Sequence, residues 1–428
     1  MYENFCRVVL LGCCVSLGWL AGGQAGMGEE LRAGDRVVLL GATLIERMQT
    51  CEQIETWLTT AQPGVTFRNL GWSGDNVFGE ARALFGSRED GFRRLEADLK
   101  ATQPTVILVA YGTNEAHEGE AGLESFTQGL DRLLGVLTST GARVVLLLPA
   151  PHEKVAGPFP DPGPFNTQLD RYRDPLKKAA EQRKLQVIDL AVLFEQARQT
   201  PPTGPLTTNG LHLDGTGYRR LAPQLAAALG LASAAWYVDY DPQDAILEAQ
   251  GCLVETVSRI AAGNVDRVPV APDQAVKPTE TSPVGSISLR IIDRMLPPPS
   301  VPNVEPMPVG TFRVRGLPTG DYELRVDEQP LLTASAAQWA QGVELMERGG
   351  SAQASELRQA IMEKNLLYMH RYRPQNETYL FLFRKHEQGN NAVEIPQFDP
   401  LVAKLETRIA ELRVPQPHLY QLVPLKRP

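Results

Sequence analysis

The stretch Thr105–Glu115, which reads TVILVAYGTNE, decides the fold of this chain. It begins with a run of mostly apolar, often β-branched residues, which is typical of a strand buried on both faces of a parallel sheet. The polar residues Gly112 to Glu115 follow directly. Because ligands of open parallel sheets bind at the carboxyl ends of the strands, these polar residues are candidates for a functional site.

Four more runs of the same kind occur in the first half of the chain, with helical candidates between them. The strand candidates are Arg36–Leu40, Val65–Leu70, Arg143–Leu148 and Leu185–Leu190. The helical candidates are Ile45–Thr60, Gly91–Ala101, Gly119–Thr140, Asn166–Lys184 and Gly215–Leu229. Strands that alternate with helices specify a parallel sheet covered on both faces. The sequence therefore predicts an α/β domain over residues 31–232, with a five-stranded parallel sheet and helices on both faces.

The composition excludes several classes of protein. The chain has 428 residues, of which 43% are hydrophobic, and a formal charge of −8 from 50 acidic and 42 basic residues. These values argue against a disordered polyelectrolyte and a polytopic membrane protein. Nucleic-acid binders usually carry clustered Lys and Arg, so we expect no nucleic acid as a partner.

The N-terminus resembles a targeting segment. Residues 8–28 carry no charge, and the apolar part Val8–Leu20 is too short for a stable membrane span. We predict a signal peptide over residues 1–25, ending at a small residue, Ala25, and hence a periplasmic or secreted protein. The residues before Cys13 also resemble a lipobox, so a lipid anchor at Cys13 is the alternative.

The mature chain would keep two cysteines, Cys51 and Cys252. They could form one disulfide in an oxidising compartment or stay as free thiols. We find no CxxC pair or His-rich spacing that suggests a metal, and we expect no cofactor.

Four polar blocks stand just after strands or before the last helix. Block one is Gly41–Thr43, block two is Asn69–Asp75, block three is Gly112–Glu115 and block four is Asn209–His212. In this order they resemble the signature blocks of the SGNH (GDSL-type) esterase and lipase family. The resemblance implies a flavodoxin-like sheet order. It also implies ester hydrolysis without a cofactor.

The resemblance also implies a role for each block. Thr43 would be the nucleophile and His212 the general base, oriented by Asn209. The Gly71 N–H and the Asn114 amide, with the N–H of Thr43, would form the oxyanion hole, where one donor contributes about 3–4 kcal/mol.

Two of these positions depart from the family pattern. Thr43 stands where the family has the serine of Gly-Asp-Ser, and its methyl group crowds the approach. Asn209 stands where the family has the aspartate of Asp-x-x-His, and an amide cannot stabilise an imidazolium as a carboxylate does. Asp189 or Asp214 could supply the missing carboxylate.

Other interpretations of these residues are open. Thr43 could cap the following helix in a capping box with Glu46. Ser73 could be the nucleophile instead of Thr43, although a hydroxyl that hydrogen-bonds its own turn is the more common case.

The second half of the chain is harder to interpret. We expect a helix and a Pro-rich linker over residues 233–285 and a small β region over 286–332, with a hairpin of Thr311–Leu317 and Asp321–Leu332. We expect a helical region over 333–428 that packs back on the α/β domain, with helices at Ala334–Glu347, Ala352–Tyr372 and Pro400–Leu412. The aromatic residues Tyr379, Phe381 and Phe383 would share one face of a strand, as a sugar platform or as core. His386, Asn390 and Asn391 would then lie near the cleft.

Two function classes follow from these observations. The first is an exported hydrolase of a small ester or an acylated carbohydrate. The second is a catalytically impaired relative that binds a glycan or an acylated ligand in the same pocket.

Overall fold

The computed structural model describes residues 30–201, 203–231, 235–242, 246–261, 264–269, 284–302, 304, 306–387, 389 and 391–425. The expected signal peptide, Cys13 and Asn390 lie outside these residues.

The first half of the chain forms the predicted α/β unit. Its sheet contains β1 (Arg36–Gly41), β2 (Thr66–Asn69), β3 (Val106–Ala110), β4 (Arg143–Leu148) and β5 (Gln186–Asp189), all parallel. The strand order is β2-β1-β3-β4-β5. This is the flavodoxin-like order, which places the switch between β1 and β3. The prediction of a five-stranded parallel sheet is confirmed.

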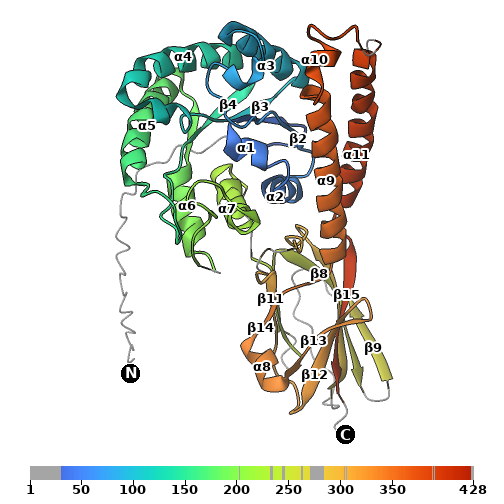
Figure 1. The fold of residues 1–428 in the computed structure, drawn as a ribbon. Coiled ribbons are helices and arrows are strands. Elements are labelled where there is room, and N and C mark those ends of the chain that lie inside the picture. The colour runs from blue at the N-terminus through green and yellow to red at the C-terminus, as the bar shows by residue number, and fades with distance from the viewer. Residues whose placement is uncertain are drawn as a thin grey trace, which may run out of the picture.

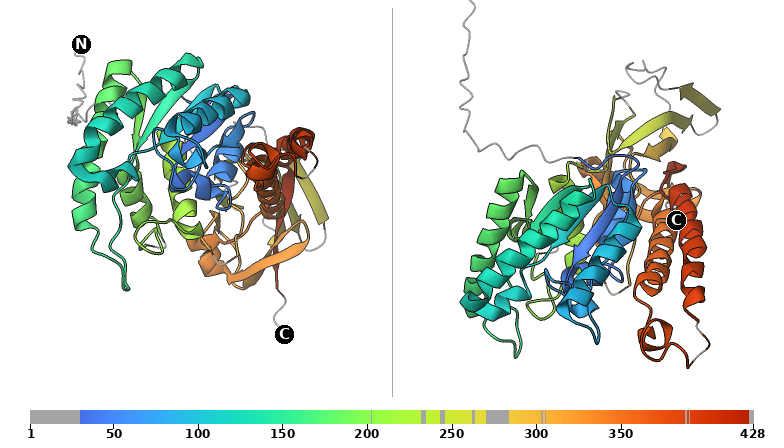
Figure 2. Two further views of the ribbon diagram at one scale, coloured as in Figure 1. Left: turned by 45° about the horizontal axis from the view of Figure 1, so that its top comes forward. Right: turned by 90° about the horizontal axis from the view of Figure 1, so that it is seen from above.

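Helices cover both faces of this sheet (Figures 1 and 2). One apolar core lies under α2 (Gln53–Ala61), α6 (Leu190–Gln199) and α7 (Gly215–Ala228). The other lies under α3 (Arg88–Thr102), α4 (Leu123–Ser139) and α5 (Gly163–Arg183). There are also three short helical segments. The segment α1 (Thr43–Arg47) follows β1, η1 (Glu80–Arg82) precedes α3, and η2 (Glu115–Gly122) follows β3. The helix expected over Ile45–Thr60 is two helices, and α6 was not expected.

The second unit is built from two facing sheets. One has the order β13-β12-β15-β10-β8-β9 and the other β14-β11-β6-β7. The strands are β6 (Tyr237–Asp241), β7 (Ile246–Gln250), β8 (Cys252–Ala261), β9 (Asn264–Pro269), β10 (Val284–Asp293), β11 (Gly310–Val314), β12 (Asp321–Val326), β13 (Gln329–Ser335), β14 (Val343–Leu345) and β15 (Pro417–Pro424). Trp236, Phe312 and Tyr420 stack between the sheets, with ring centroids 5.8 to 6.2 Å apart.

This β unit corrects two expectations. The described part of residues 233–285 forms strands rather than a helix and a linker. The expected hairpin is wrong, because β11 and β12 belong to different sheets. The hairpin is instead β12–β13, and its turn residues Asp327 and Glu328 have φ values of 49° and 69°. Positive φ at both central residues defines a type I′ turn, whose twist matches the strands.

The last hundred residues are not wholly helical. The helices α9 (Ser351–Tyr372) and α11 (Phe398–Leu412) pair side by side, with α10 (Glu377–Leu380) and η3 (Asn391–Gln397) at their far end (Figure 1). The chain then returns as β15 into the middle of the larger sheet, between β12 and β10. The helix expected over Ala334–Glu347 is shorter, α8 (Ala336–Gln341), and is followed by β14. The helical pair is thus an insertion in the β unit.

The aromatic segment near α10 does not form the expected strand. Tyr379 lies in α10, and Phe381 and Phe383 follow it in turns. Phe383 is 73% exposed and Phe381 48% exposed. Both the strand and the core interpretations are therefore wrong for these two rings. His386 is exposed at the same end of the helical pair.

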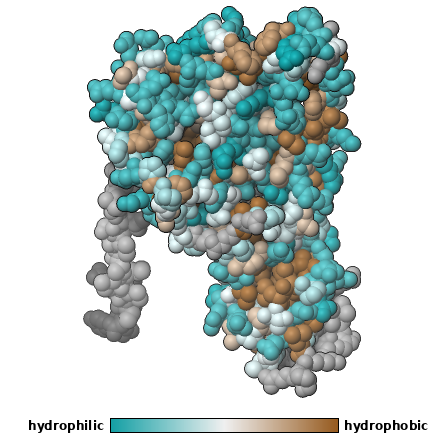
Figure 3. Space-filling model, in the orientation of Figure 1, coloured by the Kyte–Doolittle hydropathy of each residue, from teal (hydrophilic) through white to brown (hydrophobic). Residues whose placement is uncertain are grey.

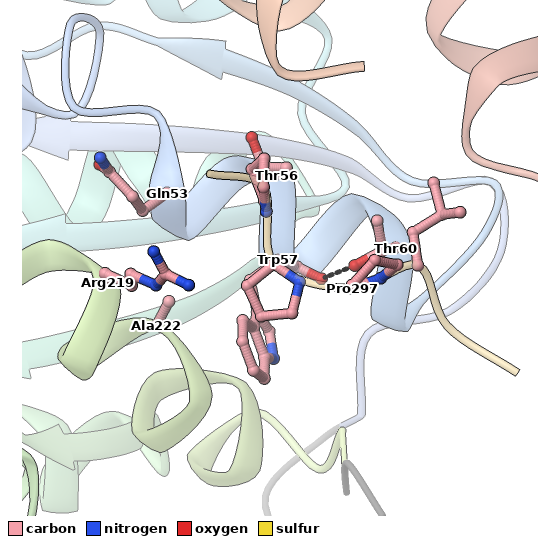
Figure 4. Close-up of a pocket in the computed structure, with 10 residues that line it drawn as sticks. Gln53, Thr56, Trp57, Thr60, Arg219, Ala222 and Pro297 are labelled. Atoms are coloured by element: carbon pink, nitrogen blue, oxygen red, sulfur yellow. Dashed lines mark hydrogen bonds between the residues drawn. The ribbon is translucent and has the colours of Figure 1, made fainter. Parts of the chain in front are cut away.

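Part of the Pro-rich stretch packs between the two units. Leu296 and the three prolines after it lie against α2 and α7 and leave a space of only about 10 Å³. Figure 4 shows Pro297 beside Thr60 and Trp57 of α2, with Arg219 of α7 across the space. Proline has little conformational freedom to lose on packing, which suits it to this role.

The helical pair packs on the edge of the α/β unit through buried charges. Lys364 Nζ donates to Glu55 Oε1 at 2.5 Å and to the Phe67 carbonyl at 3.1 Å. Asn365 donates to the other oxygen of Glu55 at 2.8 Å. Arg358 pairs with Glu52 in the same interface. The expectation that the tail packs back on the α/β domain therefore agrees with these contacts.

The surface of the α/β unit seen in Figure 3 is mainly hydrophilic, whereas hydrophobic residues gather on the β unit below it. Among the helices of the described ranges, none combines the length and the apolar character needed to cross a membrane.

Candidate functional site

The first three sequence blocks meet at the carboxyl edge of the five-stranded sheet. The Trp72 N–H donates to the Gly41 carbonyl at 3.0 Å, which joins block two to block one. Asn114 Nδ2 donates to the Asp75 carbonyl at 2.7 Å, which joins block three to block two. These bonds bring together residues that are far apart in the chain.

Block four lies against α1. The Tyr218 hydroxyl donates to the Leu44 carbonyl at 2.7 Å, which ties α7 to α1. Arg47 Nη2 approaches the Leu213 carbonyl at 3.4 Å. The residue after His212 is therefore in contact with the helix that Thr43 begins.

Thr43 is the first residue of α1, and its side chain does not cap the helix. The N-cap residue is Ala42, without a side-chain hydrogen bond. The capping box considered with Glu46 is wrong, because that carboxylate accepts the Ser73 N–H and pairs with Arg373. Within the described residues the Thr43 hydroxyl has no hydrogen-bond partner, so no local structural role occupies it.

Asn209 determines which tautomer of His212 is favoured. Asn209 Oδ1 accepts the N–H groups of His212 at 2.8 Å and of Leu211 at 3.1 Å. These two bonds fix the orientation of the amide, so its Nδ2 faces His212 Nδ1 at 3.2 Å. An N–H group can only donate, and Nδ1 must then be the acceptor. In the neutral ring the proton therefore lies on Nε2, the nitrogen that a general base needs unprotonated.

The two aspartates considered as replacements are engaged elsewhere. Asp189 caps α6 by accepting the Ala191 N–H and pairs with Arg173 at 2.5 Å. Asp214 caps α7 by accepting the Gly217 N–H at 2.7 Å. Each carboxylate thus serves a helix start.

The charges around His212 favour its neutral form. Partial burial lowers the pKa of His212, and the guanidinium of Arg47 lowers it further. Both effects disfavour the imidazolium cation. The ring therefore stays neutral down to lower pH than an unperturbed histidine does.

Gly71 is held on its N–H side by Asn69. The Gly71 N–H donates to Asn69 Oδ1 at 2.7 Å, and Asn69 Nδ2 donates to the Ile45 carbonyl at 2.7 Å. A Cβ at position 71 would lie 2.2 Å from the Glu46 nitrogen. Glycine is required here because the loop touches the backbone of α1. Use of the Gly71 N–H as an oxyanion donor requires the bond to Asn69 to open.

Two other donors are uncommitted. Asn114 uses one N–H on Asp75, and its second N–H has no partner within the described ranges. The Thr43 N–H is in the first turn of α1, where a helix offers no internal acceptor. Glu115 fixes this region by accepting the N–H groups of Val77 at 3.0 Å and Gly112 at 2.8 Å, and burial raises its pKa to about 7.

Three stacked rings beside block four were not predicted from the sequence. Phe165 lies between His152, at 4.1 Å between centroids, and His117, at 4.4 Å. Burial, with smaller effects of His117 and His212, lowers the pKa of His152 to about 4. The Glu153 N–H donates to the Gly210 carbonyl at 2.7 Å, which ties this loop to block four. The sequence could have indicated His152 as a site residue, because it follows β4 and so lies at the same edge of the sheet.

Tyr372, the last residue of α9, and Arg373, which follows it, also reach the site, and no sequence pattern indicated it. The Tyr372 hydroxyl donates to the Gly71 carbonyl at 2.9 Å. Arg373 pairs with Glu46 at 3.3 Å. His386 makes no contact with the blocks that the structure records.

The part of the chain that the structure describes contains no cluster of three or more His, Cys, Asp or Glu side chains suited to a metal. Cys51 and Cys252 are both free, and burial raises the pKa of Cys252 to about 11.

A protein-family model matches most of the α/β unit. Residues 49–220 match the GDSL-like Lipase/Acylhydrolase family. The match covers Gly71, Asn114 and His212 and begins after Thr43, the block that departs most from the family pattern. No curated protein matches the chain.

Several solved structures are similar to this chain, over different shares of its length. A gut microbial diltiazem-metabolizing enzyme has a TM-score of 0.68 at 16% identity, over 93% of this chain and 99% of that chain. A catalytic mutant of an acetylxylan esterase from Geobacillus stearothermophilus has a TM-score of 0.38 at 17% identity, over 47% and 97%. An acetyl xylan esterase has a TM-score of 0.36 at 19% identity, over 45% and 98%. The first similarity shows that the fold recurs over 93% of the chain, which includes most of its second half.

Proposed function

We propose, on the premise that residues 49–220 form a GDSL-like lipase/acylhydrolase domain, that this chain hydrolyses esters of small acyl groups, with an acylated carbohydrate as the natural substrate class. The observation that supports the proposal is that hydrogen bonds join blocks one, two and three at one sheet edge, with the residue after block four against α1. Among the described residues, the Thr43 hydroxyl and one Asn114 N–H have no partner.

The reaction assigns one step to each group. Thr43 Oγ1 attacks the ester carbonyl while His212 takes its proton, and negative charge develops on the carbonyl oxygen. The Asn114 amide and the Thr43 N–H stabilise this oxyanion, joined by the Gly71 N–H when Asn69 releases it. The C–O bond then breaks, and His212 returns the proton to the leaving alcohol. Water hydrolyses the acyl-threonine by the same steps.

The tautomer of His212 is the main obstacle to this reaction. The proton on Nε2 must leave, or the ring must turn away from Asn209, before the base can act. In a serine protease the corresponding Asp-to-Asn change lowers turnover about ten-thousand-fold for this reason. We therefore expect slow turnover.

The same observation favours a second candidate function, binding without turnover. A site that keeps oxyanion donors but holds its base in the unreactive tautomer can retain an acylated glycan as a ligand.

A short-chain nitrophenyl ester and a fluorophosphonate probe test the first function. We expect hydrolysis above the buffer rate and an adduct on Thr43, both lost in Thr43→Ala and His212→Ala. Thr50→Ala is the matched control, because that exposed threonine follows the same short helix and should not matter. An adduct on Ser73 would reassign the nucleophile. No turnover and no adduct would overturn the hydrolase proposal, and titration calorimetry with an acetylated oligosaccharide would then test binding.

We also propose that the protein is exported, from the predicted signal peptide over residues 1–25. N-terminal sequencing of the mature protein from a periplasmic or culture fraction should begin at residue 26. A lipid-modified N-terminus at Cys13 would support the lipobox alternative, and an intact Met1 in the cytosol would contradict export.

A further inference from the structure

We propose that Tyr372 and Arg373, at the end of α9, are positioning residues of the candidate active site, so that the inserted helical pair is a working part of the hydrolase. The proposal rests on the function proposed above. Neither residue belongs to the α/β unit. Both touch block two, and Arg373 also touches α1, the helix that Thr43 begins.

Tyr372 holds the loop of block two. Its side chain is buried, and its hydroxyl donates to the Gly71 carbonyl at 2.9 Å while it accepts from Gln49 Nε2 at 3.2 Å. Its ring also meets Trp72 edge-on, with centroids 6.3 Å apart. The Gly71 N–H donates to Asn69, so both the N–H and the carbonyl of this glycine are hydrogen-bonded. The orientation of the loop backbone is therefore set from two sides.

Arg373 connects the same loop to α1. Its guanidinium lies 4.0 Å from the centroid of the Trp72 ring and 3.3 Å from Glu46 Oε2. Glu46 in turn accepts the Ser73 N–H. A cation over an indole ring and a carboxylate shared by two partners form a network rather than a single surface pair. Because Glu46 is one turn after Thr43, the network fixes block two relative to the nucleophile.

The helix that carries these residues is itself fixed. Lys364 and Asn365 share Glu55 in a buried contact two turns before Tyr372. Held there, α9 presents Tyr372 and Arg373 without much freedom to move. Groups held by rigid elements have less conformational freedom to lose when the reacting atoms are aligned. A misplacement of about 1 Å can lower the rate about a hundredfold.

The test compares Tyr372→Phe and Arg373→Met with matched controls on the same helix. Tyr368→Phe changes a tyrosine one turn earlier, and Arg371→Met removes an arginine that pairs with Asp399 of α11 instead of the site. We expect kcat for the nitrophenyl ester to fall about 10- to 100-fold in the two test variants, with KM within about twofold. Fluorophosphonate labelling of Thr43 should slow by the same factor. Arg373→Lys should recover part of the rate, and the controls should match the wild type.

Hydrogen exchange separates failure of this inference from failure of the proposed function. In Tyr372→Phe and Arg373→Met, amides of residues 69–75 should exchange faster, with unchanged exchange in β3 and β4. This result would support positioning even if the wild type had no turnover. Unchanged exchange at residues 69–75, or an active wild type whose two test variants keep full kcat, would overturn the inference. A loss of rate accompanied by faster exchange throughout the α/β unit would also overturn it, because the residues would then act on folding alone.

Discussion

The substitution Asn209→Asp should turn the weak base of this site into a strong one. Asn209 Oδ1 would keep its two backbone N–H partners, and a second carboxylate oxygen would replace Nδ2 opposite His212 Nδ1, where the present distance is 3.2 Å. The carboxylate can only accept, so the ring proton moves to Nδ1 and Nε2 becomes free. The variant therefore reverses the tautomer and adds a negative charge beside the imidazolium.

The size of the effect follows from the charge pair. Opposite unit charges about 4 Å apart attract by about 4 kcal/mol at an effective dielectric constant of 20 and by about 1 kcal/mol in water. His212 is partly exposed, so screening reduces the gain, and we expect about 1–3 kcal/mol. This corresponds to a higher pKa of His212 and, from the charge pair alone, to a gain of about 10- to 100-fold in kcat/KM, to which the reversal of the tautomer adds.

Ester hydrolysis between pH 5 and 9, with the pKa of His212 measured by NMR, checks this prediction. The acid limb of kcat/KM should move to higher pH, because the carboxylate stabilises the protonated ring. Leu211→Asp is the matched control, since it adds the same charge to the same loop at an exposed position. A raised pKa of His212 without any gain in rate would refute the reasoning from the tautomer.

Four further predictions concern other parts of the molecule. Arg47→Gln removes a cation that lowers the pKa of His212, so the acid limb of kcat/KM should shift to higher pH, and an unchanged limb would contradict the assignment. His152, with a pKa of about 4, should show a constant NMR shift between pH 6 and 8, and titration in that range would show that it is charged. Thr43→Ser should label faster with fluorophosphonate, because the methyl group is gone, and slower labelling would argue against a nucleophile at 43. Lys364→Met should lower the free energy of urea unfolding by about 3–5 kcal/mol, because it leaves Glu55 buried without its cation. Lys100→Met, from an exposed pair, should change it by about 0.5 kcal/mol, and equal losses in both would contradict the burial argument.

The α/β unit was predictable because each of its strands carries its own signal. The runs around Val106 and Val144 are apolar on both faces, and their bounds in the structure agree with the sequence within a residue or two. Burial on both faces leaves little choice of residue type, so a short window of sequence is sufficient.

The β unit was not predictable, because its pairing is long-range. Residue Tyr420 pairs with Leu289 across more than a hundred residues, and β15 enters a sheet whose other strands precede the helical pair. Such strands alternate between core and surface, and nothing local tells which partner they meet. The hairpin was misplaced for a related reason. Residues 318–320, between its two expected strands, connect two different sheets, and the turn of the true hairpin lacks glycine.

The residues of the candidate site could be predicted from the sequence, but the contacts that hold them could not. The sequence placed Thr43, Gly71, Asn114 and His212 on loops that share one edge. It could not indicate that Asn69 holds the Gly71 N–H or that a tyrosine three hundred residues later holds the carbonyl. These contacts depend on how α9 packs, and no spacing in the sequence encodes that.

The insertion of the helical pair before β15 also has a consequence for biosynthesis. Domains generally fold as they leave the ribosome, N-terminal first, so the α/β unit can form while the rest is still being made. The larger sheet of the β unit cannot close until residues 417–424 emerge, because β15 separates β12 from β10. The nascent chain therefore carries the four blocks before it carries Tyr372 and Arg373, and a ribosome stalled before residue 351 should display a folded α/β unit without the support of α9.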